Sequence, residues 1–351
     1  MKKVGIVGAG LLGRLTAFML SKQGCEVELF EQTDIEPSST ENRAAAFTSA
    51  GLLSPVSEME SGGELVYTLG SESIRIWGHI SKEVKRITSK DVGLRLEGNL
   101  LVAPAAEESF VERFFKKIEY KCLQLSKKDI AKLEPNVDSK LKCWLIPGEG
   151  HIDPIVSLEA ILLATIKLNP ASQKGFRFKT KVDDLGSGWL KAEGQVFNYD
   201  LVFDTRGVGA KDLEIRGVRG ETILLDPPRT FFINRPIRFF HPRLKVYIVQ
   251  KIDGKVLIGA TEIESNDASP ISLQSALDLL TAARFVFPQL SEARIISTDT
   301  NVRPATIDNL PFFNIEKKLV RINGLFRHGW LVAPALLKEI FSKLNIPFKI
   351  C

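Results

Sequence analysis

The sequence predicts a mixed α/β fold in which a parallel sheet is interleaved with a second part built on antiparallel strands. The first 31 residues contain a short apolar strand, three closely spaced glycines, a helical pattern and a second strand. Residues 200–204 are typical of a strand that returns to the same sheet after a long excursion. Between residues 229 and 264 the pattern changes to that of β-strands. These three observations set the fold class.

Length and composition limit the class of protein. The 351 residues, 44% of them hydrophobic, are enough for about two domains with buried cores. Charged residues make up 25% of the chain, and the net charge of +5 arises from scattered Lys and Arg. A nucleic-acid binder concentrates its basic residues on one face, so no nucleic-acid partner is expected. A mildly basic surface favours anionic small ligands instead.

The cysteines and histidines predict neither disulfides nor a metal site. The cysteines are far apart and none has zinc-like spacing, so free thiols in a reducing cytoplasm are expected. The histidines are equally dispersed. These residues are Cys25, Cys122, Cys143, Cys351, His79, His151, His241 and His328.

The N-terminus resembles a signal peptide only in outline. Two lysines precede an apolar stretch, but Arg14 interrupts it and no small-residue cleavage signal follows. No run of about 18 uncharged apolar residues is present elsewhere. The sequence therefore predicts a cytoplasmic protein that does not span a membrane.

The N-terminal pattern predicts a dinucleotide site. Residues 3–7 are expected to form a strand, and residues 8–13 (GAGLLG) match the G-x-G-x-x-G motif that opens a helix. Gly24 is placed to end that helix, and residues 26–30 form a second strand that leads to Glu31. A G-x-G-x-x-G motif alone is weak evidence, but here each part follows in the required order.

Each residue of this pattern has a physical use. Gly8 permits the tight turn, Gly10 lets the backbone approach a pyrophosphate, and Gly13 permits close packing of helix on strand. The helix N-terminus presents free N–H groups to the phosphates. Glu31 can accept hydrogen bonds from the ribose hydroxyls.

The glycines do not distinguish FAD from NAD. Residues 42–54 (NRAAAFTSAGLLS), which follow the second strand, are small, flexible and apolar. Such a segment can lie beside a cofactor, or it can be a simple packing loop. Further along the chain, helices are expected at 71–87, 107–118, 155–166 and 272–287, with a turn at 148–154.

A β-hairpin is expected around an Asp-Gly pair at 253–254. The flanking segments, 245–251 and 255–262, have strand composition, and Asp-Gly favours a two-residue turn. That turn pairs Tyr247 with Ala260, and alternation along the strand then places Glu262 on the same face as Tyr247.

Two segments near the C-terminus each place one arginine among small and apolar residues. Arg303 lies in 301–311 and Arg327 in 323–334, and a helix is expected to follow as far as Leu344. Arginine is rarely buried without a partner, and its planar fork suits a carboxylate. Each is therefore a candidate ligand anchor, with a surface or salt-bridge role as the alternative.

Taken together, these segments resemble the D-amino-acid-oxidase-like flavoproteins and, among them, the glycine oxidases of thiamine biosynthesis. The resemblance covers most of the chain and rests mainly on the last three segments in fixed order. The segments are VGIVGAGLLG, AAAFTSAGLLSPVSEMES, LEPNV, PGEGHIDP, VYIVQKIDGKVLIGATE, NVRPATIDNLP and NGLFRHGWLVAPAL.

The resemblance implies a Rossmann-type FAD-binding domain interleaved with an antiparallel-sheet substrate domain. The FAD-binding domain is expected to comprise residues 1–75, 145–215 and 296–351. The substrate domain is expected to comprise residues 76–144 and 216–295.

The resemblance also implies roles for particular residues. Arg303 matches the arginine that holds the substrate carboxylate, Tyr247 matches a tyrosine of the same pocket, and Arg327 matches an arginine close to pocket and flavin. The backbone of 328–332 matches the segment at the pyrimidine edge of the flavin, and Val182 matches a contact to the adenine. The full set expected to contact FAD is Gly8, Ala9, Gly10, Leu11, Leu12, Gly13, Glu31, Gln32, Ala46, Thr48, Ser49, Ala50, Gly51, Leu52, Val182, Arg303, Arg327, His328, Gly329, Trp330, Leu331 and Val332.

The implied activity is FAD-dependent oxidative deamination of glycine or another small amino acid or amine. Dioxygen would be reduced to hydrogen peroxide, and the imine would hydrolyse to an oxoacid or enter thiazole synthesis for thiamine. A homo-oligomer is a further expectation. The alternatives are an oxidase or dehydrogenase of the same fold acting on sarcosine or a D-amino acid, and the flavin module of tRNA carboxymethylaminomethyl modification.

Two departures from the family pattern bear on the site. Residues 204–207 (DTRG) stand where many relatives carry A-T-G or A-S-G. Glu262 follows G-A-T where many relatives carry methionine. Glu262 is therefore expected either to favour a cationic substrate or to pair with a nearby arginine, and a solvated glutamate at the hairpin end is the alternative.

Overall fold

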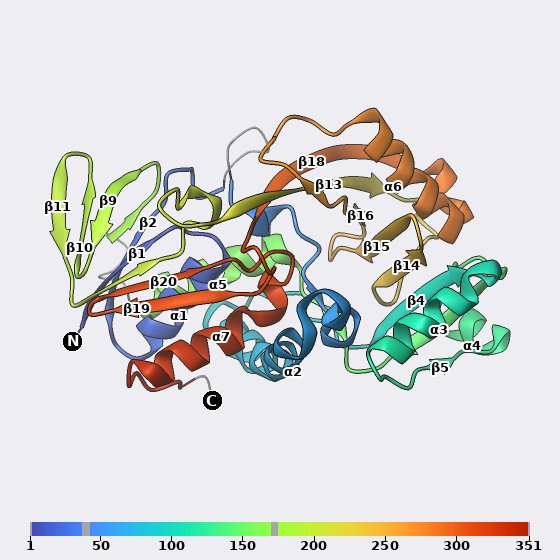
Figure 1. Ribbon diagram of the computed structural model, residues 1–351, viewed down its shortest axis with the longest axis horizontal. Coiled ribbons are helices and arrows are strands. Elements are labelled where there is room, and N and C mark those ends of the chain that lie inside the picture. The colour runs from blue at the N-terminus through green and yellow to red at the C-terminus, as the bar shows by residue number, and fades with distance from the viewer. Residues whose placement is uncertain (1, 37–42, 170–174, 350–351) are drawn as a thin grey trace.

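The computed structural model describes residues 2–36, 43–169 and 175–349, and two large sheets dominate it (Figure 1). Asn42 and Cys351, mentioned above, lie outside these ranges. The two sheets lie toward opposite ends of the longest axis, and helices α1, α2, α5 and α7 pack beside the sheet that contains β1 and β2 (Figure 1).

The six-stranded sheet contains the predicted nucleotide-binding strands. β1 pairs in parallel with β2 on one side and with β12 on the other, which confirms that the segment at 200–204 returns to this sheet. Only its edge strand β19 runs antiparallel to its neighbour. The order is β19 (Phe312–Glu316), β20 (Leu319–Asn323), β12 (Leu201–Asp204), β1 (Lys3–Val7), β2 (Glu26–Phe30) and β8 (Phe176–Arg177).

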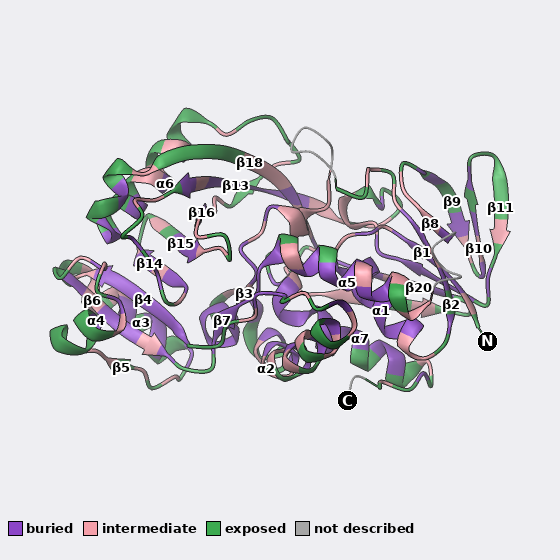
Figure 2. Cartoon of the chain, turned by 180° about the vertical axis from the view of Figure 1, so that it is seen from behind, coloured by how far each residue is buried: buried purple, intermediate pink, exposed green. Residues whose placement is uncertain are grey.

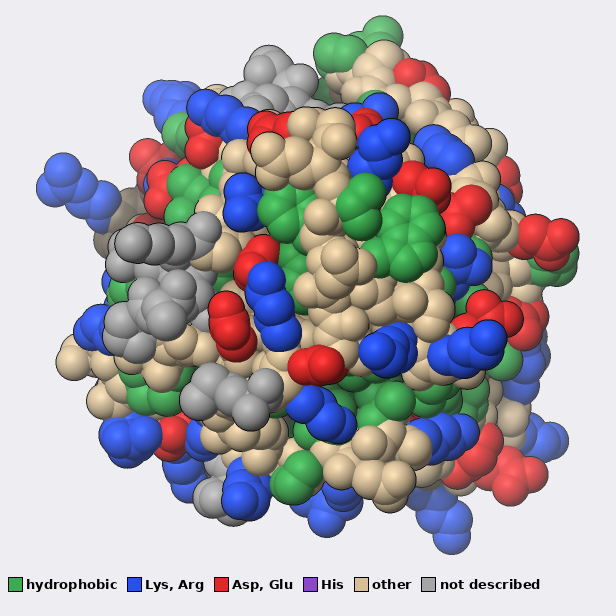
Figure 3. Space-filling view, turned by 90° about the vertical axis from the view of Figure 1, so that its left-hand side faces the viewer, with side chains coloured by type: hydrophobic (Ala, Val, Ile, Leu, Met, Phe, Trp, Pro, Cys, Tyr) green, Lys and Arg blue, Asp and Glu red, His purple; other side chains and the backbone are tan. Residues whose placement is uncertain are grey.

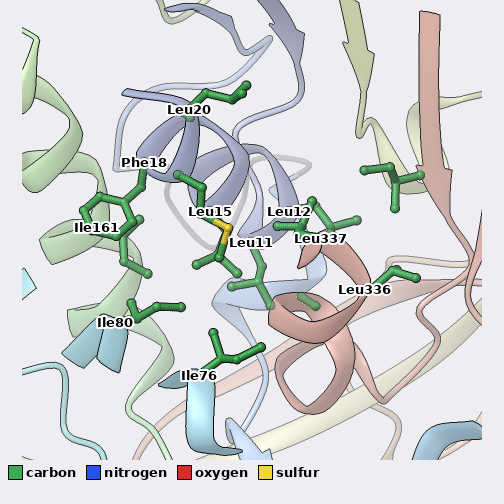
Figure 4. Close-up of a cluster of buried hydrophobic side chains, with 14 of the residues drawn as sticks. Leu11, Leu12, Leu15, Phe18, Leu20, Ile76, Ile80, Ile161, Leu336 and Leu337 are labelled. Carbon is green, nitrogen blue, oxygen red and sulfur yellow. The ribbon is translucent and has the colours of Figure 1, made fainter. Parts of the chain in front are cut away.

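Four helices bury a common apolar core beside this sheet (Figure 4). Leu11, Leu15 and Phe18 project from α1 at helical spacing and are almost fully buried, because the helix is apolar on nearly every face. Ile76 of α2 and Leu337 of α7 meet them. The helices are α1 (Leu11–Lys22), α2 (Pro55–Thr88), α5 (Pro154–Leu168) and α7 (Gly329–Lys343).

The second large sheet has nine strands and is mostly antiparallel. Its order is β17 (Ile263–Glu264), β13 (Arg216–Asp226), β16 (Val256–Gly259), β15 (Leu244–Gln250), β14 (Ile237–His241), β4 (Asn99–Pro104), β6 (Leu141–Ile146) and β5 (Leu123–Gln124), and β18 (Arg294–Ala305) pairs with β13. Helix α6 (Leu273–Val286) packs on β13, β15 and β16. The face of the sheet toward α6 is buried, whereas the outer side of β18 is exposed (Figure 2).

The remaining elements are short. They are β3 (Leu52–Leu53), β7 (Gly150–His151), β9 (Val182–Gly186), β10 (Trp189–Ala192), β11 (Gln195–Asn198), α3 (Glu108–Lys117), α4 (Lys127–Leu133) and the 3₁₀ turns η1 (Ala45–Phe47), η2 (Ala105–Glu107), η4 (Gly207–Gly209) and η5 (Pro288–Glu292). The expected helices at 107–118, 155–166 and 272–287 correspond to α3, α5 and α6 within two residues at each end. The helix expected at 71–87 is the second half of α2, which begins at Pro55. The predicted domain boundary at residue 75 falls inside α2, and the division into two domains stays a prediction.

The last helix begins earlier than the sequence predicts. We expected a helix after Pro334, but α7 starts at Gly329 and includes that proline. Because proline has no N–H, it cannot donate to the carbonyl of Trp330 one turn earlier. The indole Nε1 of Trp77 donates to that carbonyl instead, at 2.8 Å, and the two indole rings stack with centroids 5.5 Å apart. The helix therefore tolerates the proline because α2 supplies the missing hydrogen bond.

The predicted hairpin register is wrong by one residue. Tyr247 pairs with Gly259 and not with Ala260, because the turn has three residues, 252–254, between Lys251 and Lys255. A left-handed glycine at the third position (Gly254, φ +86°) allows this longer turn. The alternation argument that placed Glu262 beside Tyr247 therefore fails, since β16 also ends at Gly259.

Surface charge and the apolar character of the helices bear on contact with nucleic acid and with membranes. On the face shown in Figure 3, basic and acidic side chains are interspersed and not separated by sign. Within 2–36, 43–169 and 175–349, no helix combines the length and apolar character that crossing a membrane requires.

Candidate active site

The glycine motif forms the turn that the sequence predicts. β1 leads into Gly8, whose φ of +96° is in the left-handed region, and α1 begins at Leu11 after Gly10. No side chain caps this helix and its first turn has no acidic residue, so its N–H groups remain available to an anion. A Cβ on Gly13 would lie 1.8 Å from the carbonyl oxygen of Gly8. Gly13 therefore sets the contact between α1 and the loop before it.

We expect Gly13→Ala to abolish dinucleotide binding and to lower the free energy of unfolding by roughly 3 kcal/mol, as overpacking at a rigid backbone contact does. Thermal unfolding and FAD titration of the purified variant measure the two effects. Gly24→Ala is unsuitable as a control because of its positive φ, but Gly78→Ala on α2 has nothing within 4 Å of the added Cβ. Retention of FAD by Gly13→Ala would contradict this account of the motif.

Glu31 lies at the end of β2 beside this loop. Its Oε2 accepts a hydrogen bond from the backbone N–H of Ala9 at 2.7 Å, and its Oε1 accepts one from that of Thr33 at 3.1 Å. These bonds fix the carboxylate at the mouth of the groove that starts at Gly8. This is the position that recognition of a ribose requires.

A long groove connects the glycine motif to the antiparallel sheet. It runs from Glu31 past the N-terminus of α1 and the segment 43–52 to Tyr247 and Arg303. Because Gly8 and Gly10 line one end and leave the backbone open to a ligand there, the groove fits the extended shape of a dinucleotide. The predicted contact residues that line it are Gly8, Gly10, Leu11, Leu12, Glu31, Gln32, Ala46, Thr48, Ser49, Ala50, Gly51, Leu52, Arg303, Arg327, Gly329 and Trp330.

The other predicted contacts lie elsewhere. Val182 lines a second hollow, which shares Gly8, Glu31 and Gln32 with the groove, in the direction expected for an adenine. Leu331 and His328 line a separate pocket under the antiparallel sheet. Ala9, Gly13 and Val332 are buried behind these walls, and their contact with a cofactor stays a prediction.

The unusual segment 204–207 forms a charged cluster beside the groove. Asp204 is 1% exposed and accepts a two-pronged pair of hydrogen bonds from Arg206, whose Nη2 also donates to Asp212. The hydroxyl of Thr205 donates to the carbonyls of Val7 and Gly8. The backbone after β12 therefore packs on the glycine motif without the A-T-G sequence.

The pocket under the antiparallel sheet meets the groove at Leu52, Tyr247, Arg303 and Arg327, which line both. A molecule in the pocket would therefore lie next to the end of the groove that is farthest from Glu31. The predicted site residues Tyr247, Arg303, Arg327 and Glu262 are thus brought together, although they come from four segments of the chain.

Arg303 is a partly buried cation whose guanidinium has no carboxylate partner among the described residues. Its Nη1 donates to the carbonyls of Arg219 and Thr261, at 3.3 and 3.1 Å. Burial lowers the pKa of this guanidinium. A Cβ on Gly220 would lie 2.2 Å from its Nη2, so the absence of a side chain at Gly220 makes room for it. A partly buried arginine that lines a pocket and has no carboxylate partner is suited to an anionic ligand.

A buried acidic residue holds the loop below Arg303. Glu221 pairs with Arg219 at 2.6 Å and accepts a hydrogen bond from the hydroxyl of Thr261 at 2.9 Å. Because the carbonyls of Arg219 and Thr261 are the acceptors for Arg303, this pair fixes the position of that arginine.

Tyr247 supplies a neutral hydroxyl next to Arg303. Burial raises the pKa of its phenol, so the group stays protonated near neutral pH. A Cβ on Gly259 would lie 2.6 Å from the hydroxyl oxygen, so this strand partner also has to be glycine. Sequence reasoning identified Tyr247 but missed Gly220 and Gly259.

Glu58 is the main site residue that the sequence did not reveal. Its Oε1 pairs with Arg238 and its Oε2 with Arg327, each at 2.7 Å. Burial alone would raise the pKa of Glu58, but the charges of Arg327 and Arg238 outweigh it and hold the pKa well below its usual value. Glu58 is therefore ionised and cannot accept a proton near neutral pH. The one signal in the sequence that could have revealed Glu58 is its position as an acidic residue in the mostly apolar stretch after residue 44.

Glu262 pairs with an arginine, which is one of the three outcomes considered for it. Its Oε2 lies 2.6 Å from Nη1 of Arg327, and the glutamate side chain is 47% exposed. Arg327 therefore contacts two carboxylates, Glu58 inside the pocket and Glu262 at its mouth. A role of Glu262 in substrate selection stays a proposal.

Because the Glu262 pair is exposed, we expect Glu262→Met to change the KM for glycine by less than about threefold, the range of a surface ion pair. Steady-state kinetics with glycine and with a cationic amine check this. A tenfold or larger loss confined to the cationic amine would instead show that Glu262 binds it directly.

Comparison with known proteins identifies the family. Residues 3–340 match the family described as FAD dependent oxidoreductase. A protein of Rhizobium etli named as a thiamine biosynthesis oxidoreductase, ThiO, is 31% identical over 97% of this chain and 96% of its own length. Glycine oxidase of Geobacillus kaustophilus is 24% identical over 94% of this chain and 89% of its own.

Two further comparisons concern the fold and a larger relative. The crystal structure of that glycine oxidase superposes with a TM-score of 0.82 over 99% of this chain and 96% of its own, which at 24% identity shows the shared fold. The bifunctional protein ThiO/ThiG of Synechocystis is 24% identical over 95% of this chain, which spans 51% of that protein. Since the family match and the Rhizobium etli relative both cover nearly the whole chain, the protein belongs to the FAD-dependent oxidoreductases of this family, and FAD is its cofactor.

Proposed function

We propose that the protein oxidises glycine or another small amino acid or amine at its C–N bond. The observation that supports this is Arg303, a partly buried cation without a carboxylate partner among the described residues, at the junction of groove and pocket. The names of the relatives, ThiO and glycine oxidase, agree with this substrate class.

Arg303 and Tyr247 would hold the substrate by its carboxylate. The guanidinium can donate two parallel hydrogen bonds to a carboxylate, and the protonated phenol of Tyr247 can donate a third. Bound FAD supplies the acceptor for the two electrons that leave the substrate. The contribution of the two side chains is to fix the orientation of the carbon to be oxidised.

The pocket wall favours a small substrate. Beyond Arg303 it is closed by the ion pairs of Glu58 with Arg238 and Arg327 and by the ring of Phe240. A long apolar side chain would have to displace these charged groups, at the cost of leaving buried charges unpaired.

The fate of the product is part of the same proposal. The imine would hydrolyse to an oxoacid and ammonia, with hydrogen peroxide formed from dioxygen, or it would enter thiazole synthesis. The Synechocystis protein ThiO/ThiG supports the second route. It is named as bifunctional, and this chain matches about half of it, so a ThiO part and a ThiG part are joined in one polypeptide there.

Anaerobic addition of glycine to the purified yellow protein tests the proposal. Loss of flavin absorbance with glycine, and its return with hydrogen peroxide on aeration, is the expected result. Sarcosine and D-alanine, added in parallel, rank the alternative substrates. Absorbance that none of these amines changes would overturn the proposed function.

A further inference from the structure

Two cavities meet beside the glycine motif. The groove and the second hollow share five lining residues, which are Gly8, Glu31, Gln32, Arg206 and Gly209. A ligand that extends from the groove into the hollow has to pass these residues. Glu31 and Arg206 are the two ionisable groups among them, so Arg206 is the cation at this junction.

Arg206 lies directly against the glycine motif. Its Cα would be 3.2 Å from a Cβ on Gly8, so the absence of a side chain at Gly8 lets the segment 204–207 approach. The hydroxyl of Thr205 donates to the carbonyl of Gly8 at 2.9 Å and holds the two segments together. The segment 204–207 is also where this chain departs from the family pattern.

The guanidinium of Arg206 is held by two of its three nitrogens. Nε and Nη2 donate to the two carboxylate oxygens of Asp204, each at 2.8 Å, and Nη2 also donates to Asp212 at 2.8 Å. Nη1 has no hydrogen-bond partner among the described residues, and it is not enclosed. The N–H donors of Nη1 therefore remain available to a ligand on a group whose plane is already fixed.

The acidic partners of Arg206 do not separate it from the groove. Asp204 is 1% exposed and lines neither cavity, and Asp212 lines the hollow alone. Arg321, which pairs with Asp212 at 3.0 Å, also lines only the hollow. Of the cluster formed by these four residues, Arg206 is therefore the member that reaches the groove.

The junction is a place where a cation is needed. The N-terminus of α1 offers free N–H groups and about half a positive charge to the pyrophosphate of FAD, which is doubly negative. The negative charge of Glu31 at the same junction would repel that pyrophosphate. A guanidinium can offset this repulsion, because it is a planar donor that suits phosphate oxygens.

We propose that Arg206 binds the phosphate of FAD that carries the adenosine, through the N–H groups of Nη1, with Asp204 as its positioning residue. Of the two phosphates of FAD, this is the one next to the ribose that Glu31 is placed to recognise. The inference concerns the cofactor, so it does not depend on which amine the protein oxidises.

Titration of the full-length apoprotein with FAD, ADP and adenosine tests this assignment. Quenching of flavin fluorescence gives the Kd of FAD, and competition with FAD gives the Kd of ADP and of adenosine, which differ only in the phosphates. Arg206→Gln should raise the Kd of FAD and of ADP by about 30-fold, the range expected for loss of one charge-assisted hydrogen bond. The Kd of adenosine should not change.

A second variant and a control separate binding from folding. Arg206→Gln leaves the buried carboxylate of Asp204 without its main partner, so the double variant Asp204→Asn/Arg206→Gln, which removes both charges, is titrated as well. It should show the same selective loss. Arg216→Gln is the control, because Arg216 is also paired with a carboxylate, that of Glu264, but lines neither the groove, nor the hollow, nor the pocket. It should bind all three ligands as wild type does.

Three results would overturn the assignment. Equal weakening of ADP and adenosine would show that the variants disturb the loop and not a phosphate contact. Wild-type Kd values for FAD and ADP in either folded variant would show that the phosphate is held without Arg206. Failure of both variants to fold, seen by circular dichroism, would make the pair of Asp204 and Arg206 a purely structural one.

Discussion

Arg303→Met should raise the KM for the amino acid by about 100-fold or more. The variant removes charge-assisted hydrogen bonds to the substrate carboxylate, each worth about 1.5–3 kcal/mol, and about 2.7 kcal/mol corresponds to 100-fold. Methionine keeps much of the volume of the side chain, so the pocket should not collapse. Steady-state kinetics with glycine measure the effect, and kcat can fall as well because the carboxylate no longer fixes the orientation of the carbon.

Arg294→Met is the matched control for this experiment. Arg294 lies on the same strand, β18, but it is exposed and lines neither the groove nor the pocket. Its KM should equal that of wild type. Arg303→Lys should lie between the two, since it keeps the charge and loses the planar fork. A wild-type KM in Arg303→Met would show that the substrate is held elsewhere.

Glu58→Gln should lower the free energy of unfolding by about 3–5 kcal/mol at pH 7. Removing one member of a buried ion-pair network leaves charges uncompensated. Here Arg238 loses its carboxylate partner, and Arg327 keeps only its pair with the more exposed Glu262. Urea unfolding of both proteins measures the difference. Glu60→Gln is the control, because Glu60 is paired with Lys245 but is partly exposed, and it should cost less than about 1 kcal/mol.

The pH dependence of the Glu58 effect has a definite sign. The folded protein holds the pKa of Glu58 well below its usual value, so the stabilisation is present above the pKa of the unfolded chain. It is lost only as the pH falls through the lower, folded value. The difference between wild type and Glu58→Gln should therefore be constant from pH 6 to pH 8. A difference below 1 kcal/mol throughout that range would mean that the arginines find other partners.

The parts of the fold that depend on local sequence were predictable. The strand at 3–7, the glycine motif and the strand at 26–30 follow one another without interruption, and the structure places β1, α1 and β2 there. The hairpin failed in its register because Asp-Gly suits both a two-residue and a three-residue turn. Only the position of Lys255 opposite Lys251 decides between them.

Single site residues could be predicted from the sequence. Pairs of site residues that are far apart in the sequence could not. Arg303 stood out by its surroundings in the sequence and Tyr247 by the family resemblance, and the structure places both beside one pocket, while their roles stay predictions. The pairing of Glu58 with Arg238 and Arg327 joins α2, β14 and the loop before α7, and no spacing rule connects these segments. Gly220 leaves room for the side chain of Arg303, and Gly259 leaves room for that of Tyr247. These contacts can be seen only in the assembled sheet.

The sheet order has a consequence for the time at which the cofactor can be acquired during synthesis. β1 lies between β2 and β12, and β12 pairs in turn with β20, so the cofactor groove is walled by the earliest and the latest parts of the chain. The ribosome adds about 5–20 residues per second, so the glycine motif waits on the order of tens of seconds before Arg303 and Trp330 are made. A nascent chain thus has only the N-terminal wall of the groove. FAD can be retained only after nearly the whole chain has left the ribosome. The supply of flavin should then determine what fraction of the finished polypeptide becomes holoenzyme. It should not affect the rate at which the polypeptide is translated.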